Sequence, residues 1–248
     1  MSKIKISAVS YTNTLPFLKG IKASDKLLKQ IDLSVDVPSE CARKVIKDEV
    51  DLGIIPVAAL SKLSTYHIIS DYCIGSVGAV NSVFIYSDKP IDQIKTLKLD
   101  EQSRTSNGLA RILIKNYWKV DVKVVMQGEA DACVLIGDRT FDTKKDVPYV
   151  YDLGKYWQEF TGLPFAYAVW VSKKSLPESF VQDFNEALET GVSKIDEVIN
   201  ELEFNPNFDF NDYFKKYLHF ILDDKKRNAI DTYLKYYKEL EDIDFLGL

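Results

Sequence analysis

Short apolar segments that alternate with helix signals constrain the fold of this 248-residue chain most strongly. Apolar runs that lead into a helix start are typical of parallel strand–helix–strand units. Three such units occupy the first quarter of the sequence. We predict strands at residues 4–9, 33–37 and 52–55, followed by helices that begin near Pro16, at the cap Ser39 and at Pro56.

The same alternation restarts after a polar boundary at residues 87–90. Before it, residues 68–86 are strand-rich. Beyond it we predict strands at 97–99, 122–125, 132–136, 149–153 and 165–171, with helices at 108–118 and 156–160. From Pro177 the periodicity is helical, over 178–200, 208–218 and 225–240. This order predicts two α/β lobes joined by two crossings, residues 1–87 with 172–248 and residues 88–171. It is the layout of a two-lobed type 2 periplasmic-binding-protein-like fold, with a ligand cleft between the lobes.

Composition excludes several classes of function. Acidic residues exceed basic ones by five and the pI is about 5.2, which argues against a nucleic-acid partner. No apolar run approaches the ~18 residues of a membrane span, and the first residues do not read as a signal peptide, so we expect a cytoplasmic protein without membrane insertion. The three cysteines are scattered, and no metal-binding or nucleotide-binding motif is present. We therefore expect no metal and no cofactor.

Three polar loops stand between a predicted strand and a predicted helix: residues 10–14, 103–107 and 137–140. A helix start presents unpaired N–H groups and a partial positive charge, which suits a small anion. If the loops meet between the lobes, they would enclose an oxygen-rich anionic molecule. Each loop also fits an ordinary cap or turn.

Some single residues allow two interpretations. Arg104 could clamp a carboxylate in a two-pronged manner or face solvent. Asp138 and Arg139 could form a local ion pair. Asn81 and Ser82 lie within an apolar run, where polar groups need partners; they either face the cleft or point outward. Several aromatic residues, Tyr167 among them, could line a pocket or belong to the core.

Five motifs occur together in one order: residues 9–16 (VSYTNTLP), 53–56 (GIIP), 103–106 (SRTS), 135–139 (LIGDR) and 161–166 (TGLPFA). In this combination the chain resembles the chorismate dehydratases of the futalosine route to menaquinone, over nearly its whole length. The resemblance implies the two-lobed fold and the loss of water from chorismate, giving 3-[(1-carboxyvinyl)oxy]benzoate.

The resemblance also implies site residues. We expect Asn13 and Ser82 to be catalytic. We expect the substrate to be held by Tyr11, Thr12, Thr14, Pro56, Ser103, Arg104, Thr105, Ser106, Gly137 and Asp138.

The general base and two rival functions stay open at this point. The base is either Asp138 or a carboxylate of the substrate itself, as is thought for the family that the chain resembles. A cytoplasmic small-anion solute-binding protein would share the fold. So would 1,4-dihydroxy-6-naphthoate synthase, which carries a histidine followed by an acid where this chain has Gly137 and Asp138.

Overall fold

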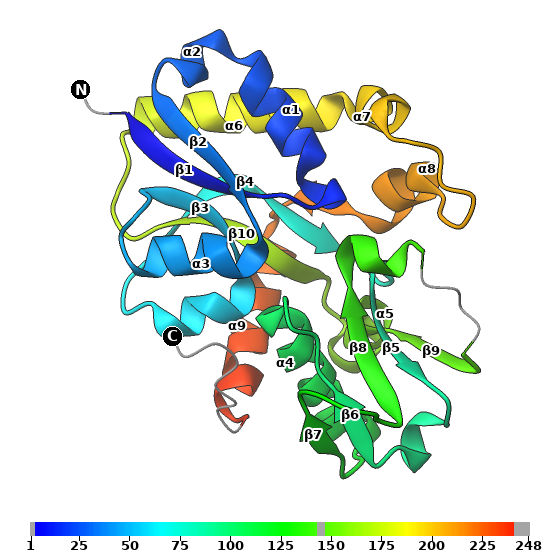
Figure 1. Cartoon of the computed structure of the whole chain (residues 1–248). Helices are drawn as coiled ribbons and strands as arrows, with labels where there is room; N and C mark the ends of the chain where they lie inside the picture. Colours follow the sequence, from blue (N-terminus) through cyan, green and yellow to red (C-terminus); the bar gives the residue numbers. More distant parts are fainter. Residues whose placement is uncertain (1–2, 143–146, 241–248) are drawn as a thin grey trace.

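A computed structural model of the chain describes residues 3–142 and 147–240 and contains two mixed β-sheets with helices around them (Figure 1). The first sheet has the order β11-β4-β10-β3-β1-β2, and the second has the order β7-β6-β8-β5-β9. The strands of the first sheet are β1 (Ile4–Val9), β2 (Ile31–Asp36), β3 (Leu52–Pro56), β4 (His67–Ser76), β10 (Phe165–Ser172) and β11 (His219–Ile221). Those of the second sheet are β5 (Val83–Ser87), β6 (Thr96–Lys98), β7 (Lys123–Val125), β8 (Ala132–Ile136) and β9 (Tyr149–Asp152).

The helices follow the predicted alternation. The α-helices are α1 (Leu15–Ala23), α2 (Asp25–Leu28), α3 (Pro38–Ile46), α4 (Arg104–Ile112), α5 (Leu153–Thr161), α6 (Glu178–Ser193), α7 (Ile195–Glu201), α8 (Phe210–Asp212) and α9 (Asp224–Lys238). Within the described residues there are also four 3₁₀ turns, η1 (Thr12–Thr14), η2 (Val57–Lys62), η3 (Ile91–Gln93) and η5 (Gly137–Thr140), and two π-helical segments, η4 (Leu113–Trp118) and η6 (Tyr213–Tyr217).

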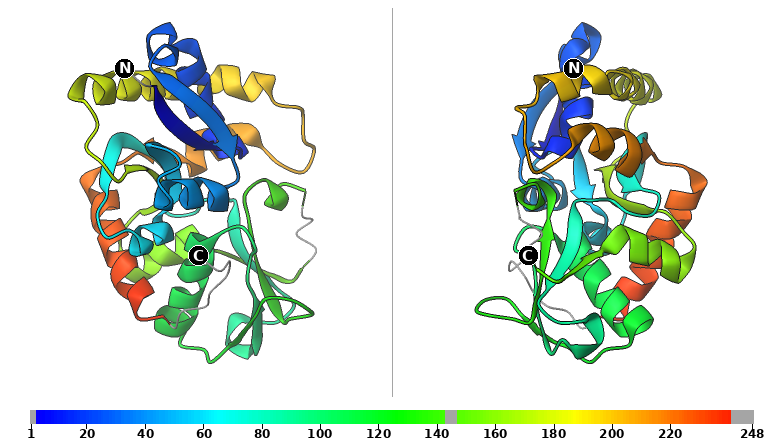
Figure 2. Two further views of the ribbon diagram at one scale, coloured as in Figure 1. Left: turned by 60° about the vertical axis from the view of Figure 1, so that its left-hand side comes forward. Right: turned by 90° about the vertical axis from the view of Figure 1, so that its right-hand side faces the viewer.

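Each sheet contains one antiparallel strand that arrives from the other half of the chain. Strand β10 enters the first sheet between β3 and β4, and β5 enters the second sheet between β8 and β9. The pairs β1–β2, β1–β3, β6–β7 and β6–β8 are parallel, as the alternation predicted, and β11 pairs antiparallel with β4. The two views of Figure 2 show the sheets at opposite ends of the molecule. We call the first sheet with its helices the first half of the molecule, and the second sheet with its helices the second half. Helix α9 packs against β10 and against α4, and so contacts both halves.

Sheet membership changes before β5 and before β10, so residues 83–87 pair in the second sheet and residues 165–172 pair in the first. A strand's own sequence does not state which sheet it joins. The division into lobes at 1–87 with 172–248 and 88–171 stays a prediction.

Several local predictions were also wrong. Helix α4 begins at Arg104, so residues 104–107 are helical and Ser103 is the cap. Helix α3 begins at Pro38, and Ser39 lies inside its first turn. The segment after Pro56 is a 3₁₀ turn. The predicted helix 208–218 is a short α8 with the π-helical η6, and β11 follows it.

Helices α1 and α6 make the closest helix contact of the first half. A Cβ added at Gly20 would lie 1.9 Å from the carbonyl oxygen of Ala187, and one at Gly191 would lie 1.9 Å from that of Pro16. The two backbones touch there, so these positions require glycine. This contact fixes α1, whose first turn leads out of the β1 loop, against the sheet.

Asp131, directly before β8, links that strand to the start of β6 in the second sheet. Its carboxylate accepts hydrogen bonds from the N–H groups of Lys95 (2.7 Å) and Thr96 (3.1 Å) and pairs with the Lys89 ammonium at 2.5 Å. These donors favour the charged form and lower the pKa of Asp131 to about 2.

We expect Asp131 to make stability depend on acid pH. Because its folded pKa lies below the ordinary value of 3.8, its stabilising effect is present above about pH 4 and is lost as the pH falls toward 2. Urea unfolding at stepped pH should show Asp131→Asn less stable than wild type at pH 6, with the gap closing near pH 2. Asp92→Asn, the same change at an exposed position, is the control. A gap that stayed constant with pH would contradict this role.

Candidate active site

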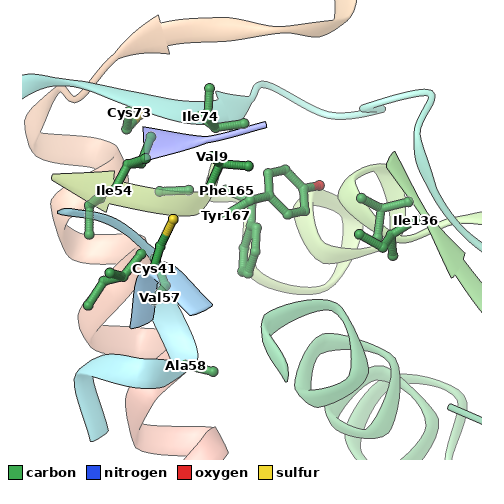
Figure 3. Packing of buried hydrophobic residues seen from close by; sticks show 14 of the residues in the cluster. Val9, Cys41, Ile54, Val57, Ala58, Cys73, Ile74, Ile136, Phe165 and Tyr167 are labelled. Atoms are coloured by element: carbon green, nitrogen blue, oxygen red, sulfur yellow. The ribbon is translucent and has the colours of Figure 1, made fainter. Parts of the chain in front are cut away.

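A cavity of about 70 Å³ lies where the two sheets meet. Its walls are mostly apolar, and polar groups reach it from helix starts and from the crossing before β5. In Figure 3 the ring of Tyr167 projects from β10 toward Ile136 of the second sheet, with Val9 and Ile54 nearby. The lining residues are Val9, Tyr11, Asn13, Thr14, Pro38, Ile54, Pro56, Ile74, Val80, Ser82, Val83, Ser103, Thr105, Ser106, Ile136, Gly137, Tyr167 and Ala168.

The loop after β1 brings Asn13 to the cavity. Residues 12–14 form η1, which runs directly into α1 with Pro16 in the first helical turn. The Thr14 hydroxyl donates to the Asn13 carbonyl oxygen at 3.1 Å. This bond occupies the acceptor of the amide, so the Asn13 NH₂ group is the end left for other acceptors.

The start of α4 forms the opposite polar wall. Ser103 caps the helix by accepting from the Ser106 N–H (3.1 Å), and its hydroxyl donates to the Ser106 hydroxyl (2.9 Å). The Thr105 hydroxyl accepts from the N–H of Ala58 at the start of η2, at 3.1 Å. Two helix starts, from the two halves of the molecule, are therefore joined beside the cavity. The start of α4, whose residues line the cavity, carries positive partial charge.

Hydrogen bonds to the backbone of residues 80–82 fix the position of Ser82. Asn81 before it has φ = 58°, a left-handed conformation, and the Asp152 carboxylate accepts from the N–H groups of Val80 and Asn81. The Gly137 N–H donates to the Ser82 carbonyl at 2.8 Å. Asn81 and Ser82 thus lie in a turn before β5, not inside a strand as predicted. Left-handed backbone at a non-glycine residue costs free energy and is often found at functional sites.

The polar loops of the two halves also bind each other directly. The Asp138 carboxylate accepts from the Thr12 N–H (3.1 and 3.2 Å) and from the Thr12 hydroxyl (2.9 Å), and the Tyr11 hydroxyl donates to Gln102. Burial raises the pKa of Asp138, and the bonds from Thr12 partly oppose that shift. These contacts join the loops at 10–14 and 137–140, and Ser103, Thr105 and Ser106 of the third loop line the same cavity.

Arg139 does not pair with its neighbour Asp138. Its guanidinium contacts the buried Asp100 at 2.6 and 2.7 Å. The ion pair of Arg139 is thus a long-range one with Asp100, not the local pair with Asp138 that the sequence left open. The pair fixes the turn after β8 to the segment that leads into α4.

The structure brings most predicted site residues to one place. Tyr11, Asn13, Thr14, Pro56, Ser82, Ser103, Thr105, Ser106 and Gly137 line the cavity, while, among the described residues, Thr12, Arg104 and Asp138 do not. One guanidinium nitrogen of Arg104 is buried without a hydrogen-bond partner in that described part of the chain. Thr12 and Asp138 instead bind each other at the cavity's edge.

Sequence reasoning missed two residues next to the site. Asp152 supports the turn before Ser82, and Tyr213 donates to the Ser82 hydroxyl. They lie 70 and 131 positions away from Ser82, and no local signal connects them. Tyr167 was one of several aromatics that could line a pocket, and it does so.

We find no cluster of metal-binding side chains within residues 3–142 and 147–240. No group of three or more His, Cys, Asp and Glu side chains there could hold a metal ion, and the three cysteines are free thiols. In the same ranges, no helix has the length and apolar character of a membrane span.

Comparisons with solved structures place the fold. An Archaeoglobus fulgidus protein superposes with a TM-score of 0.71 at 16% identity, covering 96% of both chains. A Candida albicans protein described as having the generic periplasmic binding protein fold superposes with a TM-score of 0.62 at 13% identity, covering 98% of this chain and 92% of its own. The two-lobed α/β fold of periplasmic binding proteins, predicted from the sequence, is confirmed.

Comparisons with characterised sequences place the family. The chain is 26% identical over 188 residues to the chorismate dehydratase of Thermus thermophilus, covering 65% of this chain and 69% of the relative. It is 24% identical over 128 residues to the 1,4-dihydroxy-6-naphthoate synthase of the same organism, covering 48% and 47%. Residues 4–239 match the model of a family described as menaquinone biosynthesis. The chain therefore belongs to the menaquinone biosynthesis family.

Proposed function

We propose that this protein is a chorismate dehydratase, a hydro-lyase that eliminates water from chorismate to give 3-[(1-carboxyvinyl)oxy]benzoate. The observation that carries the proposal is the cavity between the two halves, with apolar walls and polar groups from two helix starts. Such a site suits a ring that bears carboxylates. The similarity to the Thermus dehydratase supports the same substrate.

The proposed reaction requires the protein mainly to position the substrate and to stabilise the charge that develops on it. Removing the ring proton beside the enolpyruvyl ether and expelling the neighbouring hydroxyl as water makes the ring aromatic. Aromatisation drives the reaction, so neither a redox cofactor nor a metal is required. Charge develops on the ring carboxylate as the proton leaves, and donors aimed at that carboxylate lower the barrier.

The lining residues supply such donors. In the proposal, the starts of α1 and α4 bind the two carboxylates, the latter through its first-turn N–H groups and the Thr105 and Ser106 hydroxyls, with Ser103 as the cap that orients Ser106. Asn13, with its carbonyl bonded to Thr14, presents its NH₂ group to the departing hydroxyl or to a carboxylate. Ser82 completes the pocket.

A carboxylate of the substrate is the base in this proposal. Both oxygens of Asp138 accept hydrogen bonds from Thr12, and Asp138 does not line the cavity among the described residues. That arrangement favours a role in joining the two halves. The protein would then act by orientation and exclusion of water.

The halves must separate for the substrate to enter. A cavity of about 70 Å³ is smaller than the ~300–1,000 Å³ of typical ligand pockets. Entry therefore breaks contacts such as Thr12 with Asp138 and Tyr11 with Gln102, and closure restores them around the ligand.

We propose a cytoplasmic location for the reaction.

The position of Gly137 disfavours the naphthoate synthase alternative. Its φ is +62°, and a Cβ added there would lie 3.0 Å from the ring of Tyr11. A histidine at this position would strain the backbone and press on Tyr11. The histidine expected of that synthase thus has no room here.

Incubation of the purified protein with chorismate tests the proposed reaction. We expect loss of the diene absorbance and an aromatic product lighter than chorismate by one water, seen by mass spectrometry. Tight binding of chorismate without turnover would instead indicate a solute-binding protein. If the protein neither binds chorismate nor converts it, chorismate is refuted as the substrate.

Asn13→Ala should lower kcat by about 10²–10³-fold, because a preorganised donor to developing charge is lost. The Asn13 side chain is only half-buried, so we expect the fold to persist, checked by circular dichroism and melting temperature. Asn228→Ala, on an exposed face of α9, is the matched control and should leave kcat unchanged. Turnover of Asn13→Ala at the wild-type rate would remove Asn13 from the mechanism.

Asp138→Asn should retain kcat within about tenfold of wild type, because the amide keeps an acceptor for Thr12 and the base lies on the substrate. Loss of a general base typically costs about 10²–10⁴-fold. Steady-state kinetics on chorismate distinguish the two. A loss in the larger range, with folding intact, would assign the base to Asp138.

A further inference from the structure

Tyr213 lies directly behind Ser82. Its side chain is completely buried, and its hydroxyl donates to the Ser82 hydroxyl oxygen at 3.1 Å. In the described part of the chain, Ser82 lines the cavity and Tyr213 does not. Tyr213 therefore reaches the cavity through Ser82, and it also interacts with the Asn13 side chain by hydrogen bonding.

The Tyr213 ring is fixed by aromatic packing from both halves of the molecule. Ring centroids of Phe208, Phe141 and Phe214 lie 5.1, 5.4 and 5.5 Å away, and Phe141 follows η5 of the second half. Tyr213 also opens the π-helical segment η6. Such widened turns are rare and frequently found at functional sites. Close packing of this kind holds the phenol in one position.

The direction of the hydrogen bond matters for Ser82. Because Tyr213 donates, the Ser82 oxygen serves as acceptor, and the proton of Ser82 remains for a partner in the cavity. A hydroxyl that accepts one hydrogen bond becomes a better donor in the next. The Ser82 carbonyl is fixed separately by the Gly137 N–H at 2.8 Å. Backbone and side chain of Ser82 are thus both constrained.

Tyr213 keeps its own proton throughout. Burial raises the pKa of its phenol well above the usual range, and the nearby charge of Asp138 raises it further. The phenol is therefore a permanent donor at the pH of the cell.

We propose that Tyr213 is a positioning residue that orients the Ser82 hydroxyl, so that Ser82 donates to the charge developing on the bound substrate. The inference rests on the proposed dehydration. It assigns a role to the C-terminal segment that no site motif of the sequence indicated. Tyr213 makes no bond to the substrate and exchanges no proton with it.

Tyr213→Phe tests the role with little change in packing. We expect kcat on chorismate to fall about 3- to 10-fold, the equivalent of one neutral hydrogen bond, with KM within about twofold of wild type. In a Ser82→Ala background, the same substitution should reduce kcat by less than half as much, since its route of action is gone. Tyr151→Phe is the control, because it also removes a hydrogen-bonded phenol oxygen, one that accepts from the Ile91 N–H, at a position outside the cavity lining of the described residues.

The outcomes separate this inference from the proposed function. If the wild-type protein converts chorismate and Tyr213→Phe has the same kcat, the role of Tyr213 is overturned and the proposed dehydration stands. An equal loss in the wild-type and Ser82→Ala backgrounds would also overturn it, because Tyr213 would then act independently of Ser82. Absence of turnover by the wild-type protein would refute the dehydration, and the role of Tyr213 with it. Melting temperatures of all variants identify any loss caused by unfolding.

Discussion

The exchange of strands between the two sheets is the constraint on which the rest of the structure depends. Because β5 and β10 each cross into the other sheet, the chain passes the junction twice, and the turn before β5 places Ser82 there. Strand β10 likewise carries Tyr167 and Ala168 into the cavity wall. Parallel strands point their carboxyl ends toward the same junction, where the polar loops follow. The candidate site is therefore a consequence of the topology.

The charge distribution of the cavity follows from its location. Apolar side chains of two cores surround it, and a carboxylate brought there without donors would cost several kcal/mol. Helix starts and hydroxyls supply those donors where the chain leaves β1 and enters α4. Of the nearby acids, Asp100 pairs with Arg139, while Asp138 accepts hydrogen bonds from Thr12 and Asp152 accepts them from the turn before Ser82. These partners stabilise the charge of each carboxylate in the folded protein.

Sequence patterns predicted the elements and the meeting of the loops, and they failed where long-range pairing decides. Apolar periodicity identified β1, β3 and α1 because burial sets those patterns locally. The sheet that β5 joins depends on partners far along the chain, which periodicity does not encode. Arg139 pairs with Asp100 instead of adjacent Asp138 for the same reason. Tyr213 resembled an ordinary packing residue, since only the fold brings it beside Ser82.

A crystal structure with bound 3-[(1-carboxyvinyl)oxy]benzoate would test whether chorismate reacts in the junction cavity. We expect the product to be enclosed between the two halves, with one carboxylate at the start of α4, the other at the start of α1, and Asn13 and Ser82 in contact with it. Product bound outside this cavity, or bound there with its carboxylates away from both helix starts, would refute this location of the active site.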